Sequence, residues 1–383
     1  MNLDSWQSAD YNLWILIPLL ILGYSLLNAF VIWRLKPLWP KDKSWRISGL
    51  AITFFFVLMP FIGNYGDHVL FDYCYYIGSF WASMVILTIA GILMIMLVNG
   101  FVWLINTFFS KKNKYLANRW LLLGVIVIGF VLNIYGVLQT RLPQVEKLDL
   151  KTSKLPSQID EIKIVQISDV HSGFALNSIG LDRLVERIEK EDPDILVSTG
   201  DLFDKVNFRA DEVVEVFKDI KPQFGKYAVI GNHEVYAGTD WAVEMTEKAG
   251  FKVLRDETIT IENVLNIAGI DDPADASEEP EKEAKILRHA DPDLLTIFLK
   301  HEPVSLEKSR DIFDLQLSGH LHGGDFPFRW LIAMHHNQLE EYKTETKMYV
   351  SRGWGSTELP ISRIGARPEI ALITIKKSRK PGR

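Results

Sequence analysis

Five short polar motifs occur in the second half of this 383-residue chain, and each lies just after a short apolar run. All five contain carboxylate, amide or imidazole side chains, and three of them also contain glycine. In chain order they are Asp169-Val170-His171, Gly200-Asp201-Leu202-Phe203-Asp204, Gly231-Asn232-His233-Glu234, Lys300-His301-Glu302-Pro303 and Gly319-His320-Leu321-His322-Gly323-Gly324. Polar groups that follow successive strands meet at one edge of a sheet, so the pattern predicts an α/β fold with one site at that edge.

The apolar runs themselves have the length and composition of strands. We expect strands at 162–167, 195–198, 227–230, 294–299 and 314–317. Between them, apolar residues at helical spacing predict helices, one over 176–190 and another around 213–217. The sequence from residue 141 onward has about 240 residues, enough for one well-filled core.

The donor types in the five motifs indicate a transition-metal site. Mixed carboxylate, amide and imidazole ligands suit Mn²⁺, Fe or Zn²⁺ better than Ca²⁺, which prefers oxygen alone. Taken alone, Asp-x-His carries little information, and Gly-Asp-x-x-Asp is explained by a capping aspartate at a strand-to-helix turn. The motif Gly-His-x-His-Gly-Gly is more specific, because two histidines between glycines are poorly explained as satisfied core residues.

The ordered set of motifs resembles the calcineurin-like metallophosphoesterase superfamily, over roughly residues 160–376. Residues 348–353 and 367–375 resemble the closing strands of its membrane-associated subgroup. The resemblance implies an α/β sandwich with two divalent ions. One ion would be bound by Asp169, His171, Asp201 and His322, and the other by Asp201, Asn232, His301 and His320. Asp201 would then bridge the two ions.

Other residues of the motifs are expected to support the reaction without binding metal. His233 lies beside Asn232 and is our candidate to protonate the leaving oxygen or to stabilise the transition state. Glu234 either orients His233 or is a carboxylate favoured by a helix N-terminus. Asp204 is expected to support the ligands or to cap a helix.

Two further residues are candidates for substrate binding. Arg352 is expected either to bind the substrate phosphate, for which a guanidinium is suited, or to form a structural salt bridge. Asp325 stands where many relatives have glutamine, after Gly-His-x-His-Gly-Gly. It can tune the site, bind a ligand amine or face solvent.

The first 140 residues differ from the rest. Apolar stretches cover 12–33, 47–63, 78–109 and 120–140, each long enough or nearly so to span a bilayer core. Eight of the 11 tryptophans precede residue 121, many near the expected helix ends, as in interfacial belts. These features predict about four transmembrane helices in residues 1–140. A connector at 141–160, the phosphoesterase domain at 161–376 and a basic tail at 377–383 would follow.

Charge placement predicts the orientation of this region. Basic residues of the first half fall in two short loops, at 34–46 and 111–119, and the positive-inside rule places both loops in the cytoplasm. With four spans, the catalytic domain of this multi-pass cell-membrane protein would lie outside the cytoplasm. The alternative, a cytoplasmic enzyme, requires one span to be miscounted.

The charge of the chain limits the classes of partner that it can bind, and its cysteine content limits the disulfides that it can form. Nine basic and five acidic residues lie among the first 140, whereas the remainder holds 33 basic and 43 acidic residues. So acidic a domain is a poor nucleic-acid binder, because affinity for the phosphate backbone comes mainly from lysine and arginine. The lone cysteine, Cys74, excludes an intramolecular disulfide framework.

An apolar segment at 326–334 follows the last motif and suggests a substrate class. It either packs in the core or rests on a lipid surface beside the site. We therefore expect a membrane-anchored two-metal phosphoesterase acting on a phosphoester or phosphodiester of a lipid-linked substrate. The alternatives are a phosphoesterase for soluble nucleotides or phosphoproteins, an enzyme similar to UDP-diacylglucosamine pyrophosphohydrolases, and a non-catalytic metal-binding membrane sensor.

Overall fold

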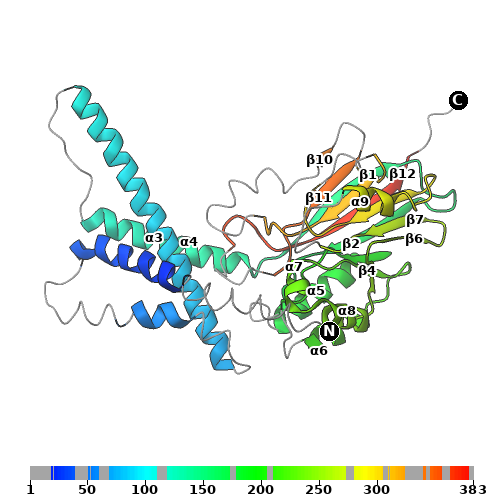
Figure 1. Cartoon of the computed structure of the whole chain (residues 1–383), viewed down its shortest axis with the longest axis horizontal. Helices are drawn as coiled ribbons and strands as arrows, with labels where there is room; N and C mark the ends of the chain where they lie inside the picture. The colour runs from blue at the N-terminus through cyan, green and yellow to red at the C-terminus, as the bar shows by residue number, and fades with distance from the viewer. Residues whose placement is uncertain are drawn as a thin grey trace. The chain divides into compact units, whose positions relative to one another are not determined.

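The chain divides into two compact units, residues 1–135 and 136–383, and each is described here by itself (Figure 1). The computed structural model describes residues 19, 21–38, 51, 53–59, 69–109, 119–172, 178–204, 210–272, 280–304, 309, 311–323, 340–341, 346–355 and 363–378.

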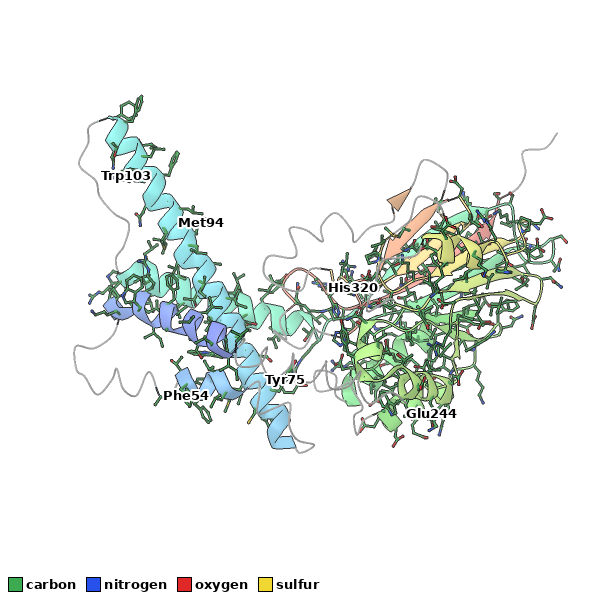
Figure 2. The ribbon with its side chains drawn as sticks, viewed as in Figure 1. Phe54, Tyr75, Met94, Trp103, Glu244 and His320 are labelled. Carbon is green, nitrogen blue, oxygen red and sulfur yellow. The ribbon has the colours of Figure 1, made fainter. Side chains whose placement is uncertain are left out.

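Two described helices are long and apolar enough to cross a membrane. They are α3 (Val69–Phe108) and α4 (Arg119–Gln139). Large apolar side chains on α3 face outward, among them Met94 and Trp103 (Figure 2). Exposed apolar faces of this size are typical of contact with lipid or with another protein.

The four-span prediction is supported only in part. Two of the expected spans, 78–109 and 120–140, correspond to α3 and α4. Within the other two, the described residues form a shorter apolar helix at Ile21–Arg34, followed by the turn η1 (Lys36–Leu38), and a helical segment at 53–59. The rest of the two N-terminal spans lies outside the described residues.

Helices α3 and α4 pack closely against each other. The Asn133 side-chain amide donates to the carbonyl of Phe80 at 2.9 Å. A β-carbon at Gly91 would lie 2.5 Å from Cγ1 of Val125, so glycine is needed there for the close approach of the two helices. Small residues serve the same purpose in membrane helix pairs generally.

The second unit contains two six-stranded mixed sheets. In sheet order, the first has β1 (Gln144–Thr152), β12 (Glu369–Lys377), β2 (Glu161–Ile167), β3 (Ile195–Ser198), β4 (Lys226–Ala228) and β5 (Lys252–Val253). The second has β10 (Glu340–Glu341), β11 (Lys347–Val350), β9 (Leu315–Ser318), β8 (Leu295–Leu299), β7 (Leu265–Gly269) and β6 (Glu257–Ile261). The expected strands are therefore present.

The two sheets face each other across a common core. Ile164 and Val197 of the first sheet belong to the same buried cluster as Ile297 and Leu317 of the second. On the outer face of the first sheet pack α5 (Ser178–Glu191), α6 (Ala210–Lys218) and α8 (Thr239–Lys248). Helix α9 (Pro280–Leu287) packs on the outer face of the second. The result is an α/β sandwich, as expected.

The segment that was expected to be a connector contains a strand. Residues 144–152 form β1, which pairs in parallel with β12 along its whole length. Leu148 and Leu150 pack against the core between the sheets, while the intervening Asp149 is exposed. This two-residue alternation is a strand pattern, which the mixed charge of the segment obscures.

Strand direction determines where the polar motifs gather. In the first sheet β2, β3 and β4 are parallel, and in the second β7, β8, β9 and β11 are parallel. The five motifs follow β2, β3, β4, β8 and β9. The carboxyl-terminal ends of these strands therefore bring all five motifs to one edge of the sandwich.

Candidate metal centre

The backbone is strained at most of the expected ligands. Nine described non-glycine residues have positive φ, and five of them are Asp169, His171, Asp201, His320 and His322, at 47–71°. Left-handed backbone costs on the order of 1–3 kcal/mol at a non-glycine residue and persists only where its surroundings enforce it. Such strain is concentrated here at one edge of the sandwich, as it often is at functional sites.

The first group of side chains surrounds His171. Its Nε2 lies 2.9 Å from Nε2 of His322 and 3.7 Å from Oδ2 of Asp201. Oδ1 of Asp169 lies 3.4 Å from Nε2 of His322. All four residues are buried. Two imidazole nitrogens and two carboxylates thus converge on a small volume, where a cation would neutralise their charge.

The second group surrounds Asn232, the first residue of α7 (Asn232–Ala237). Its Oδ1 lies 3.1 Å from Nε2 of His301 and 3.1 Å from Nδ1 of His320. Those two nitrogens are themselves 3.1 Å apart, and Nε2 of His301 is 3.2 Å from Oδ2 of Asp201. An amide oxygen, two imidazoles and a carboxylate therefore point to one place.

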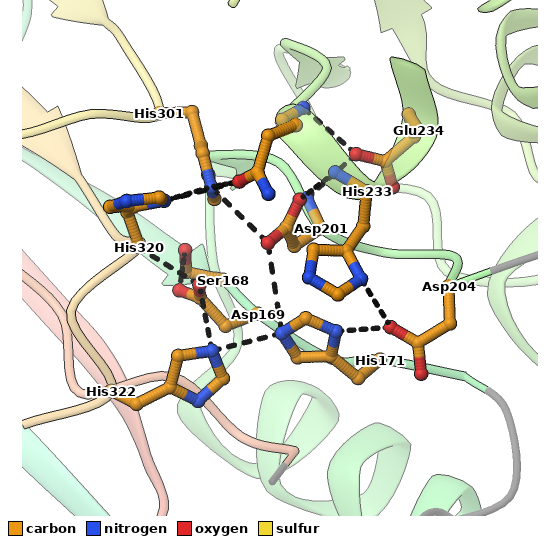
Figure 3. A network of polar contacts seen from close by, with 12 residues as sticks. Ser168, Asp169, His171, Asp201, Asp204, His233, Glu234, His301, His320 and His322 are labelled. Carbon is orange, nitrogen blue, oxygen red and sulfur yellow. Dashed lines mark hydrogen bonds and ion pairs between the residues drawn. The ribbon is translucent and has the colours of Figure 1, made fainter. Parts of the chain in front are cut away.

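Asp201 joins the two groups. The same oxygen, Oδ2, faces Nε2 of His171 on one side and Nε2 of His301 on the other (Figure 3). Its other oxygen accepts the backbone N–H of His233 at 3.0 Å. The structure thus places Asp201 between both sets, where the family resemblance expects a bridging carboxylate.

Asp204 and His233 lie beside the first group. The Asp204 carboxylate contacts Nδ1 of His171 and lies 3.1 Å from Nδ1 of His233. Rings of His171 and His233 meet edge to face, with centroids 4.6 Å apart. Burial opposes protonation of His233, but its hydrogen bond to the Asp204 carboxylate and the charge of Asp201 raise its pKa overall.

Glu234 is bound to the backbone. Its carboxylate accepts the N–H groups of Gly231 and Asp201, each at 2.8 Å, and that of Phe203, also at 2.8 Å. The bond to Gly231 is the capping interaction of a helix start. Of the two expected roles, the structure shows the helix N-terminal carboxylate, which here also ties the Asp201 loop to the Asn232 loop.

Glycine is required where these loops approach each other. A β-carbon at Gly319 would lie 1.9 Å from Oγ of Ser168 and 2.3 Å from Oδ2 of Asp169. One at Gly231 would lie 2.3 Å from Oδ1 of Asp201. Any side chain at either position would displace a candidate ligand.

The electrostatics of the metal-free cluster hold some candidate ligands in the forms that bind metal and others in protonated forms. Burial opposes protonation of His171 and His301, but Asp204 raises the pKa of His171 to about 10 and Asp201 raises that of His301 well above its usual value. Burial opposes ionisation of Asp201, but the charge and hydrogen bond of His301 hold its pKa far below the usual range. Burial lowers the pKa of His320 and of His322, and neighbouring positive charge adds to both effects. Ionised carboxylates and neutral imidazoles are the forms that metals require.

Of the two predicted substrate-binding residues, only Arg352 lies within the described part of the chain. Arg352 forms ion pairs with Glu369 and, at 3.1 Å, with Glu146, so the structure shows it in the salt-bridge arrangement. Burial opposes the protonated form, but the Glu369 charge raises the pKa of Arg352 overall. Asp325 and the apolar segment 326–334 lie outside the described residues, and their roles stay predictions.

Comparison with known proteins identifies the fold and chemistry. Residues 162–324 match the family model described as calcineurin-like phosphoesterase. A metallophosphoesterase of Aquifex aeolicus is 35% identical over 258 residues, which cover 65% of this chain and 98% of that protein. The chain belongs to the calcineurin-like phosphoesterase family. It is therefore a metal-dependent phosphoester hydrolase.

Other relatives of this calcineurin-like phosphoesterase include membrane proteins by name. One from Danio rerio, called a transmembrane protein with metallophosphoesterase domain, is 28% identical over 66% of this chain and 62% of its own length. A metallophosphoesterase of Campylobacter jejuni is 30% identical over 72% of this chain and 76% of its own length. Together with α3 and α4, these likenesses suggest association with a membrane.

The residues present fit divalent ions. Three sets of donors each lie within 4.8 Å of one another, namely Asp169–His171–His322, His171–Asp201–His233 and Asp169–Asp201–His301. Family members use divalent metals, and buried carboxylates and imidazoles in such proximity fit that use. The donor set of the phosphoesterase suits Mn, Fe or Zn.

Sequence reasoning missed two residues of this phosphoesterase site. Arg363 is fully buried, and its Nη2 lies 3.1 Å from Nδ1 of His322. Asp272 follows β7 at the same sheet edge, and burial raises its pKa to about 6. The position of Asp272 after an apolar run could have indicated a site residue from the sequence. Arg363 is a single arginine in a loop, and no sequence pattern marks it.

Our first prediction follows from the shared position of Asp201. With replete metal, the wild-type protein should hold two divalent ions per chain. Asp201→Ala should lose both ions, because both groups lose their common oxygen, whereas Asn232→Ala should keep one. Elemental analysis of the purified protein measures the stoichiometry, and circular dichroism checks that each variant is folded. A wild-type protein that holds at most one ion would contradict the two-ion arrangement.

Proposed function

We propose that this chain is a membrane-anchored two-metal phosphoesterase that hydrolyses a phosphoester or phosphodiester in a lipid-linked substrate. Seven side chains in two groups, joined at Asp201, support the two-metal part of the proposal. Divalent ions bound there would activate a water for attack and neutralise charge on the phosphate.

The chain's own residues would orient and protonate the substrate. His233 lies at the rim of the first group, and its side chain is 24% exposed. Asp204 accepts a hydrogen bond from its Nδ1 and favours the protonated ring. A protonated imidazole at this place can donate to the leaving oxygen, a contribution commonly worth about 10²–10⁴-fold in rate.

One observation carries the lipid part of the proposal. The backbone N–H of Arg363 donates to the carbonyl of Gly136 at 3.2 Å, and that of Gly365 donates to Oε1 of Gln139 at 2.9 Å. Gly136 and Gln139 form the last turn of α4, while the side chain of Arg363 contacts His322. A single residue therefore separates a candidate metal ligand from the end of an apolar helix. The phosphoesterase domain directly follows α4 in the chain, so a membrane-spanning α4 would anchor the domain to the membrane that holds a lipid substrate.

We further propose that the phosphoesterase domain lies outside the cytoplasm. The basic loops at 34–46 and 111–119 support this orientation through the positive-inside rule. A lipid substrate would then present its phosphate in the outer leaflet.

Loss of His233 should affect poor leaving groups most. His233→Ala should keep both ions and lose about 10²–10⁴-fold in kcat on unactivated esters, but much less on activated aryl esters, because protonation matters least there. Rates across a series of leaving groups measure this. The control is Tyr236→Ala, which removes the ring 5.9 Å from His233 and should leave the series unchanged. Equal losses across the series would indicate a positioning role.

A lipid substrate should be preferred over its soluble counterpart. In proteoliposomes, we expect kcat/KM to be at least about tenfold higher for a long-chain phosphodiester than for a short-chain one with the same headgroup. The reason is that each buried methylene favours binding by roughly 0.8 kcal/mol. Asp201→Ala measures contaminating activity. Equal kcat/KM, or faster hydrolysis of soluble nucleotides, would contradict the lipid proposal.

Chemical labelling can determine the orientation. In a Cys74→Ala background, a cysteine introduced in place of Lys190 on α5 should react with a membrane-impermeant maleimide in intact cells. One introduced in place of Lys112 should react only after permeabilisation. The reverse result would place the phosphoesterase domain in the cytoplasm.

A further inference from the structure

In His171, His301 and His322, Nε2 faces the other candidate ligands and Nδ1 lies on the far side of the ring. The hydrogen-bond partners of these three Nδ1 atoms differ. Nδ1 of His171 faces the carboxylate of Asp204, and Nδ1 of His301 lies 2.8 Å from the carbonyl oxygen of Thr199. Both partners accept hydrogen bonds. Each therefore keeps the ring proton on Nδ1 and leaves Nε2 free for a metal, which is the usual outer contact of a metal-binding histidine.

His322 has the opposite partner. Its Nδ1 lies 3.1 Å from Nη2 of Arg363, and a guanidinium has donors only. Nδ1 must therefore accept, so that the neutral ring carries its proton on Nε2. That nitrogen faces His171 at 2.9 Å and Asp169 at 3.4 Å, on the side where an ion would bind. Binding an ion at Nε2 requires the proton to move to Nδ1, where it would meet another donor.

The guanidinium is not easily moved aside. Arg363 is fully buried, and Nη2 also donates to the carbonyl of Arg352 at 2.7 Å, while Nη1 donates to that of Gly353 at 3.1 Å. Its backbone is held by Gly136. Withdrawing the guanidinium from His322 would disturb these bonds, so an ion at His322 must overcome a fixed opposing donor and a fixed positive charge.

We propose that Arg363 weakens the ion held by Asp169, His171 and His322, so that this ion binds less tightly than the one on the Asn232 side. The inference rests on the proposed two-metal function and adds an order of affinity to it. The more weakly held ion would be the exchangeable one, and the occupancy of that side would set how much of the enzyme is active at a given metal concentration.

Metal titration of the full-length protein in detergent tests the proposal. After chelation, Mn²⁺ is added in competition with a chromogenic chelator, and the wild-type protein should bind in two steps. In Arg363→Gln, the amide oxygen can accept the Nδ1 proton of His322, so the weaker step should tighten by about tenfold, the scale of outer-partner effects. The tighter step should not change. Arg363→Lys keeps a donor-only cation and should not tighten the weaker step.

A second comparison leaves Arg363 in place, in case its variants do not fold. Asn232→Ala removes a ligand from the second group and His322→Ala one from the first. The ion that remains in Asn232→Ala should bind at least about tenfold more weakly than the ion that remains in His322→Ala. Thermal melting of the metal-free proteins checks that all variants are folded.

The possible outcomes separate the two proposals. If Arg363→Gln binds the weaker ion no more tightly than the wild type, or if the two single-ion variants bind equally well, the role of Arg363 is overturned while the two-metal site stands. If the wild-type protein binds no Mn²⁺ at all, the proposed function itself fails.

Discussion

Peptide hydrogen bonds between adjoining loops hold the metal site in shape, and everything at the sheet edge depends on them. The backbone N–H of Asp169 donates to the carbonyl of Gly200 at 3.0 Å, and that of His171 to the carbonyl of Asp201 at 2.9 Å. The Glu234 carboxylate then links the Asp201 loop to the start of α7. These bonds offset the cost of left-handed backbone, so the ligand positions are set by the polypeptide itself.

How much the sequence could predict depends on the range of each interaction. Strands and their polar ends are local features, so the gathering of Asp169, Asn232 and His301 at one edge followed from the order of motifs. The groups that contact Nδ1 of the candidate histidine ligands were harder to predict from the sequence. Arg363 meets His322 only because two loops from different parts of the chain are neighbours in space, and nothing local marks that contact. Strand β1 was missed for another reason, because its charged residues concealed its alternation.

The number and type of donor atoms in a ligand group do not by themselves determine how tightly it binds a metal ion. His171 and His301 have acceptors behind them, and His322 has a guanidinium. Two ligand groups with similar donors therefore differ in electrostatic surroundings. Because outer partners decide which ring nitrogen holds the proton, they affect affinity without touching an ion.

The loop that carries Arg363 also contacts the end of α4. The last four carbonyls of α4 belong to residues 136–139, and those of Gly136, Leu138 and Gln139 already accept the N–H groups of Thr140, Arg141 and Leu142. Arg363 supplies a second N–H to the carbonyl of Gly136, and Gly365 binds the side chain of Gln139. Gly365 has φ of 82°, which suits glycine and allows the loop to turn there. The end of α4 and the ring of His322 are thus held by opposite ends of one buried arginine.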